Sequence, residues 1–113
     1  MKYIVYDIDL ISESLEEHIK YNLIEAINLF DEIDPVDRYY EDEDDREHSI
    51  EEVNNRQGWL ASEDSYDNDK PTRYVILLKQ EEGVFEHFMN YCYEKDKVSK
   101  IINRHRNLET LLQ

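Results

Sequence analysis

The chain of 113 residues contains 28 acidic and 13 basic residues, which gives a formal net charge of −15 at pH 7. Such a charge repels nucleic acid and anionic membranes, and it favours a basic protein as the partner. A hydrophobic fraction of 40% with nine tyrosines argues against a disordered acidic tail and predicts one folded domain over residues 1–113.

The first third of the chain predicts a strand and a helix. The segment KYIVYDID near residues 2–9 is rich in β-branched and aromatic residues, which is typical of a strand, buried on both faces if it is central. Ser14 stands three residues before Glu17, as in a capping box. We therefore expect a helix over residues 14–31, ended by Asp34-Pro35, whose apolar face is made of Leu15, Ile19, Leu23, Ile27 and Phe30.

The middle of the chain allows two interpretations. Ser49 and Glu52 match a second capping box, which predicts a short helix that begins near His48 and ends at Gly58. Alternatively, GWLAS at residues 58–62 supplies a third strand. Under either interpretation we expect Trp59 to lie in the core or at a hinge rather than in a partner contact.

The last third predicts one strand and two helices. TRYVILLK, at residues 72–79, has the continuous apolar run of a buried strand. Two apolar stripes at helical spacing follow, with a break near Lys95-Asp96-Lys97; they consist of Val84, Phe85, Phe88, Met89 and Cys92, and of Val98, Ile101, Ile102, Leu108, Leu111 and Leu112. The expected fold class is therefore α+β, a small sheet packed with three to four helices.

The negative charge is concentrated in the middle of the chain. Residues 1–30 carry six acids and two bases, residues 31–69 carry sixteen acids and three bases, and residues 70–113 carry six acids and eight bases. The net charges of these thirds are thus −4, −13 and +2. We call residues 31–69 the acidic segment; it contains EDEDDREHSIEE at residues 41–52, where eight of twelve residues are acidic.

Asp7-Ile8-Asp9, at the end of the first expected strand, resembles the opening motif of haloacid-dehalogenase-like phosphatases. The resemblance implies a nucleophilic Asp7, an Asp9 acting as general acid and base, and a bound Mg²⁺. The Gly-Thr pair that follows the motif in that family is replaced by Leu10-Ile11-Ser12, and 113 residues leave no room for the family's usual sheet. We therefore interpret the motif as a strand that runs into a helix-capping turn.

No metal site, cofactor or catalytic residue is predicted. A calcium-binding loop needs glycine at its sixth position, which is Glu47 in a loop starting at Asp42 and Thr72 in one starting at Asp67. The four histidines lack zinc-ligand spacing, and the sequence contains no phosphate-binding glycine loop or nucleophile elbow. We therefore expect a protein that is not an enzyme.

One cysteine, Cys92, excludes an internal disulfide and is expected to be buried in a helix. No apolar run approaches the roughly 18 residues of a membrane span, and no leader pattern is visible. The expected location is the cytoplasm, and the host cytoplasm for a viral protein.

The acidic segment is the expected binding surface, because it combines phosphate-like carboxylates with aromatic residues that often anchor interfaces. In size and composition the chain resembles the phage and mobile-element inhibitors that mimic DNA against restriction, repair or CRISPR proteins. We therefore expect an inhibitor that covers the nucleic-acid-binding surface of a basic protein. The predicted contact residues are Tyr39, Tyr40, Glu41, Asp42, Glu43, Asp44, Asp45, Glu47, Glu51, Glu52, Asp64, Tyr66, Asp67 and Asp69.

Two other functions stay open. An immunity protein or antitoxin that blocks the basic active site of a nuclease toxin would use the same electrostatics. A structural or assembly protein would instead bind a second copy of itself. In that case the basic residues near the end of the chain could contact the acidic segment of the next copy, through Lys95, Lys97, Lys100 and Arg104.

Overall fold

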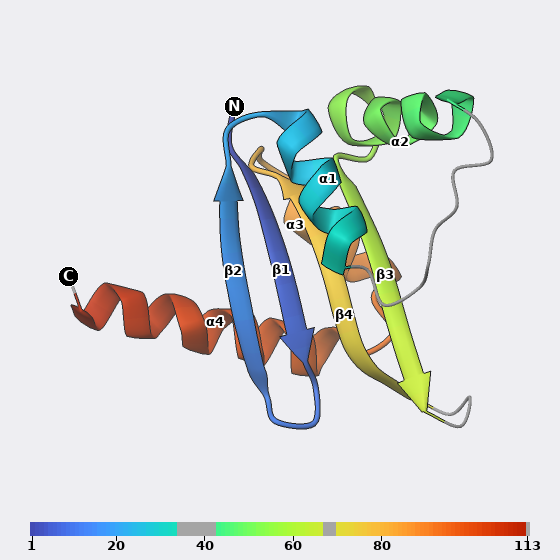
Figure 1. Ribbon diagram of the computed structural model, residues 1–113. Helices are drawn as coiled ribbons and strands as arrows, with labels where there is room; N and C mark the ends of the chain where they lie inside the picture. The colour runs from blue at the N-terminus through green and yellow to red at the C-terminus, as the bar shows by residue number, and fades with distance from the viewer. Residues whose placement is uncertain (34–42, 67–69, 113) are drawn as a thin grey trace.

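The computed structural model describes residues 1–33, 43–66 and 70–112, with side chains described for residues 1–33, 47–63 and 71–106. Strands and helices alternate in pairs along the chain (Figure 1). Their bounds are β1 (Tyr3–Asp9), β2 (Ser14–Lys20), α1 (Leu23–Ile33), α2 (Glu43–Asn55), β3 (Trp59–Tyr66), β4 (Lys70–Lys79), α3 (Val84–Tyr91) and α4 (Lys95–Leu112).

The described strands form one antiparallel sheet of four in the order β2-β1-β4-β3. This arrangement confirms the α+β class, and the third strand that the sequence suggested near 58–62 is present as β3. Helices α1 and α2 lie on one side of the sheet, and helices α3 and α4 lie on the other (Figure 1). We call these the α1 side and the α4 side.

Each side of the sheet has its own hydrophobic core because side chains alternate along β1. Ile4, Tyr6 and Ile8 face the α4 side, where they join Phe88 of α3 and residues of α4. Tyr3, Val5 and their neighbours on β4 face the α1 side and pack on α1 and α2. Phe88 is 1% exposed, and burying one such side chain contributes roughly 1.5–3 kcal/mol. The first strand is central in the sheet, and it is buried on both faces, as the sequence predicted for a central strand.

The predicted helix over residues 14–31 is wrong in its first half. Residues 14–20 form strand β2, which pairs with β1 over its whole length, and only Leu23–Ile33 is helical. Ser14 and Glu17 are therefore not a capping box. The residue that caps α1 is Asn22, whose Oδ1 accepts hydrogen bonds from the backbone N–H of Ile24 at 2.9 Å and Glu25 at 3.2 Å.

A tight turn joins β1 to β2 in place of the expected helix-capping turn. The Asp9 Oδ1 atom accepts hydrogen bonds from the backbone N–H groups of Ile11 at 2.9 Å and Ser12 at 3.1 Å. Glu13 has a φ of 55°, a left-handed conformation that reverses the chain. Asp9 thus stabilises a hairpin, and the strand that follows returns along β1.

Both structures that the sequence suggested for the middle of the chain, a helix and a strand, are present. Helix α2 begins at Glu43, so Ser49 lies inside it and is not its cap. The helix ends before Gly58, as expected, and Gly58 has a φ of 85° and donates its N–H to the Glu52 carbonyl at 3.0 Å. Strand β3 follows immediately.

The two C-terminal helices are confirmed. The break between them lies at residues 92–94, slightly before the predicted position, and Cys92 is 7% exposed at the end of α3. The side chains of Leu108, Leu111 and Leu112 lie outside the described ones. Among the helices of the described part, none is both long enough and apolar enough to cross a membrane.

Candidate partner-binding surface

Helix α2 anchors part of the acidic segment to the sheet. Val53 is fully buried, and Ile50, one turn earlier, packs against the same core. Because these two residues occupy the inner face of the helix, Glu47 and Glu51 are left exposed, one helical turn apart. Two of the predicted contact residues are therefore held in place by a packed helix.

Glu52 is less available to a partner than its neighbours. Its side chain is 21% exposed, and its Oε1 atom lies 3.1 Å from Arg56 Nη1 and 3.7 Å from His48 Nε2. These pairs join successive turns of α2, so Glu52 chiefly strengthens the helix that presents Glu47 and Glu51.

For the remaining predicted contact residues the structure describes either the backbone alone or nothing. Six of them lie outside the described residues: Tyr39, Tyr40, Glu41, Asp42, Asp67 and Asp69. Five others belong by their backbone to α2 or β3, while their side chains lie outside the described ones: Glu43, Asp44, Asp45, Asp64 and Tyr66. Their role in binding stays a prediction.

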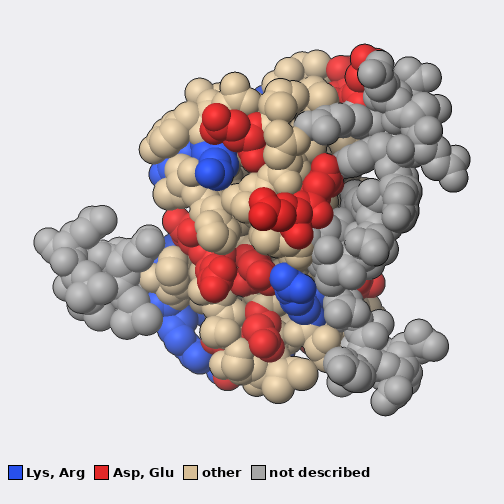
Figure 2. Space-filling model, viewed as in Figure 1, with Lys and Arg blue, Asp and Glu red and all other residues tan. Residues whose placement is uncertain are grey.

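Further carboxylates that were not among the predicted contact residues lie on the same side of the sheet as α2, and all but Glu32 are outside the acidic segment. The pairing of β1 with β2 sets Asp7 opposite Glu16 and Asp9 opposite Ser14, all on the α1 side. Glu25 and Glu32 of α1 are also exposed. Figure 2 shows acidic side chains spread across this face of the molecule. The acidic surface is therefore broader than the acidic segment.

Arg73 of β4 partly neutralises this surface. Its Nε and Nη2 atoms each lie 2.9 Å from one oxygen of Asp7, and Nη2 also donates to the Ile33 carbonyl at 3.1 Å. The guanidinium thus joins β1, β4 and the C-terminal end of α1, where a cation interacts favourably with the helix dipole. Because both Asp7 oxygens are bonded to Arg73, Asp7 is positioned as a structural carboxylate.

Asp9 and Glu16 border the same shallow depression, which has a volume of about 440 Å³ and is lined also by Asp7, Ser14, Leu15 and Arg73. The backbone N–H groups of Ser12 and Ile11 lower the pKa of Asp9 below its ordinary value of 3.8. Asp9 is therefore ionised at neutral pH. The Glu16 carboxylate lies 3.6 Å from His18 Nε2 on the same strand.

The basic residues predicted for self-contact lie on α4. Lys95, Lys97, Lys100 and Arg104 are all exposed, whereas Val98, Ile101 and Ile102 of the same helix are buried against the sheet. We call these four exposed cations the basic strip. It belongs to the α4 side, so the fold separates it from the carboxylates of α2.

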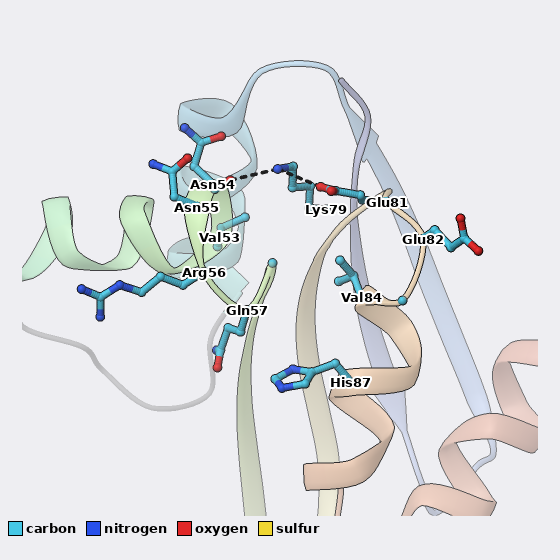
Figure 3. A pocket seen from close by; sticks show the side chains of 12 residues that line it. Val53, Asn54, Asn55, Arg56, Gln57, Lys79, Glu81, Glu82, Val84 and His87 are labelled. Carbon is cyan, nitrogen blue, oxygen red and sulfur yellow. Dashed lines mark hydrogen bonds and ion pairs between the residues drawn. The ribbon is translucent and has the colours of Figure 1, made fainter.

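A second cavity, of about 540 Å³, opens where the end of α2 meets β3, β4 and α3 (Figure 3). Lys79 Nζ bonds there to the Asn54 carbonyl at 2.9 Å and to Glu81 at 2.9 Å. Its charge is thus used to join α2 to the end of β4. His87 of α3 faces the same space in Figure 3.

Trp59 belongs to the packed body, as expected. Its ring lies edge-on to Phe88 with centroids 5.2 Å apart, and its Nε1–H donates to His87 Nδ1 at 2.9 Å. The exposed ring of Tyr91 lies 5.9 Å from Trp59. Trp59 therefore connects β3 to α3 on the α4 side, away from the acidic surface.

Sequence reasoning missed Asp9, Glu16 and Glu25 as members of the surface because acidic residues are no more frequent than usual around them in the chain. It also left out Glu32, which lies in the acidic segment but before the densest acidic run. Recognising residues 14–20 as a strand would have placed Glu16 beside Asp7.

Among the described residues, no group of three or more His, Cys, Asp or Glu side chains is arranged to hold a metal ion. No protein-family model, curated protein or solved structure matches this chain.

Proposed function

We propose that this protein is a non-enzymatic inhibitor that binds the basic, nucleic-acid-binding surface of another protein. The observation that carries the proposal is the convergence of exposed carboxylates on the α1 side. They come from separate elements, with Glu16 on β2, Glu32 on α1, and Glu47 and Glu51 on α2. A surface built from several packed elements can present charges at fixed separations, as a nucleic-acid backbone does.

Electrostatic complementarity would make association fast and sensitive to salt. The net charge of −15 would steer the protein toward cationic surfaces. Placing like charges near one another destabilises a fold through self-repulsion, a cost that contact with a cationic surface would offset. The resemblance in composition to phage inhibitors of restriction or CRISPR proteins supports the same class of target.

The partner can be identified by affinity capture from a host lysate, with elution by rising salt. A nuclease or other DNA-binding protein that elutes at high salt and is displaced by duplex DNA supports the proposal. If the captured protein is a nuclease toxin, the protein acts as an immunity protein. Failure to retain any basic protein at low salt contradicts both functions and favours an assembly role.

The surface is tested by the triple variant Glu32→Gln, Glu47→Gln and Glu51→Gln. Each exposed charge is expected to contribute roughly 0.5 kcal/mol, so affinity for the captured partner should fall about tenfold and its salt dependence should weaken. The control is Glu82→Gln, Glu86→Gln and Asp96→Asn, which removes the same charge from exposed positions outside α1, α2 and β2. Equal losses in both variants would show that net charge, not this surface, determines binding.

A further inference from the structure

Strand β2 is an edge of the sheet whose outward backbone groups can be assigned from the hydrogen bonds of β1. Leu10 N donates to Thr72 O and Gln80 N donates to Lys2 O, each at 2.9 Å. Even-numbered residues of β1 therefore bond to β4, and odd-numbered ones bond to β2. The β1–β2 register then directs residues 14, 16, 18 and 20 toward β1. The N–H and C=O groups of Leu15, Glu17 and Ile19 point away from the sheet.

The two edges of the sheet differ in how they are protected. Strand β3 has a register shift between Asp64 and Ser65, and Gln57 Nε2 donates to the outward carbonyl of Trp59 at 2.7 Å. Bulges and side-chain caps of this kind prevent edge-to-edge pairing. Strand β2 has an unbroken register over seven residues. Within the described part of the chain, no hydrogen bond reaches the outward backbone groups of β2.

We propose that β2 pairs antiparallel with β2 of a second copy, about a two-fold axis at Glu17. The outward groups then meet in three hydrogen-bonded pairs, with two bonds in each pair. Glu17 pairs with Glu17 of the partner subunit, and Leu15 pairs with Ile19 of the partner subunit, twice by symmetry. The result is a closed dimer with one continuous sheet.

The side chains of β2 favour this register. On the α1 side, Glu16 comes opposite His18 of the partner subunit, and Ser14 comes opposite Lys20 of the partner subunit. On the α4 side, Leu15 meets Ile19 of the partner subunit, and Ile19 is 39% exposed in the single chain. Such cross-strand pairs contribute roughly 0.2–1 kcal/mol each. Registers shifted by two residues would instead set Glu16 against itself or His18 against itself.

The two Glu17 side chains at the axis repel one another, which is the main cost of the arrangement. His105 of α4 lies close to this position, with its Nε2 atom 3.5 Å from Glu17 Oε2. Helix α4 crosses β2 on the α4 side and extends beyond it (Figure 1). The helix thus covers the α4 side of β2 and continues past its free edge, so in the dimer it would lie behind β2 of the partner subunit.

The symmetry axis is perpendicular to the sheet, so the α1 sides of both copies face the same direction. If the proposed function is correct, the dimer therefore presents an acidic surface of twice the extent. The dimer itself does not depend on that function. Pairing through β2 can be distinguished from self-association through the basic strip. The double variant Lys100→Glu with Arg104→Glu would abolish contact through the basic strip and leave β2 pairing intact.

Disulfide cross-linking of Glu17→Cys tests the proposal directly. Opposed residues of a hydrogen-bonded antiparallel pair have Cα atoms about 5.5 Å apart, a separation that a disulfide spans. Under mild oxidation we expect most of the protein to become a covalent dimer. The matched control is Ile11→Cys, in the β1–β2 turn, where Ile11 is 75% exposed; it should cross-link little. Equal or absent cross-linking in the two variants would overturn the proposal.

Sedimentation equilibrium of Ile19→Pro provides a second test. Proline removes an outward N–H that β1 does not use, so the monomer should keep its circular dichroism spectrum while the dimer dissociation constant rises at least tenfold. The control, Ile11→Ser, changes an exposed side chain of the turn, keeps the N–H that Asp9 accepts and should leave the constant unchanged. Unchanged dimerisation of folded Ile19→Pro, or a wild-type monomer at all concentrations, would contradict the inference. If Ile19→Pro does not fold, the cross-linking result decides.

Salt distinguishes failure of this inference from failure of the proposed function. Two copies of a chain with charge −15 repel each other, so raising salt should strengthen β2 pairing. Binding to a basic partner should weaken under the same change. Loss of one behaviour without the other shows which proposal is wrong.

Discussion

At the scale of single residues, Gly58 determines how closely α2, β3 and α3 approach one another. Its φ of 85° is unfavourable for residues with a side chain, and an added Cβ would lie 2.8 Å from Val84 Cγ2. Its carbonyl also accepts a hydrogen bond from Lys79 N at 2.8 Å. The sequence predicted the helix end at Gly58, but the contact with Val84 depends on how α3 packs.

Gly58→Ala is expected to lower the free energy of unfolding more than Gly83→Ala. Gly83 has a φ of 87° but no atom within 4 Å of an added Cβ, so its substitution costs only the backbone term, about 1–2 kcal/mol. Gly58→Ala adds the collision with Val84, about another 1–3 kcal/mol. Urea denaturation of both variants measures the difference. Equal losses would mean that Val84 moves aside without cost.

Tyr74 and Cys92 should make the protein sensitive to alkali. Burial is the largest cause that raises the pKa of each group, from ordinary values of 10.0 for the Tyr74 hydroxyl and 9.0 for the Cys92 thiol. Below about pH 8 both groups are mostly protonated in folded and unfolded chains, and stability is unaffected. Above these values the unfolded chain loses protons that the folded chain keeps, so stability falls by up to about 1.4 kcal/mol per pH unit for each group.

The measurement compares unfolding free energies at pH 8 and pH 11. Tyr74→Phe should show a smaller loss over this range than the wild type. Tyr91→Phe is the control, since Tyr91 is 70% exposed, and it should behave like the wild type. An unaltered pH profile in Tyr74→Phe would contradict the assignment.

At the scale of elements, the error over residues 14–31 has a physical reason. Leu15 and Ile19 are four residues apart, a spacing that places them on one face of a helix and equally on one face of a strand. The local residue pattern therefore did not discriminate between a helix and a strand over residues 14–20. The strand forms because the turn stabilised by Asp9 returns the chain beside β1, whose backbone groups then pair with those of β2. Helix α1 could begin only where Asn22 caps it.

Arg73→Met tests the attachment of α1 to the sheet. The substitution removes the donors to Asp7 and to the Ile33 carbonyl, so the unfolding free energy should fall by about 1–3 kcal/mol. Arg56→Met is the control: Arg56 is 56% exposed and pairs with Glu52 within one helix, so its loss should cost about 0.5 kcal/mol. Both are measured by urea denaturation. A cost for Arg73→Met no larger than the control's would show that α1 is held by its apolar face alone.

At the scale of the whole molecule, the fold separates charges that the sequence only concentrates. Exposed carboxylates of α1, α2 and β2 lie on the α1 side, while the basic strip lies on α4. The two proposed associations use different parts of this arrangement, a charged surface for the partner and a strand edge for the second copy. Their opposite dependence on salt follows from that difference.

Composition and periodicity within single elements were enough to predict the α+β class, the strand character of β1, the apolar stripes of α3 and α4, and the acidic character of residues 31–69. Three features became evident only in the folded chain: residues 14–20 form a strand, Asp7 is bonded to Arg73, and Glu16 joins the acidic surface. The first and third depend on pairing across the β1–β2 turn, and the second on a contact between residues 66 positions apart. The residue pattern within a single element encodes neither.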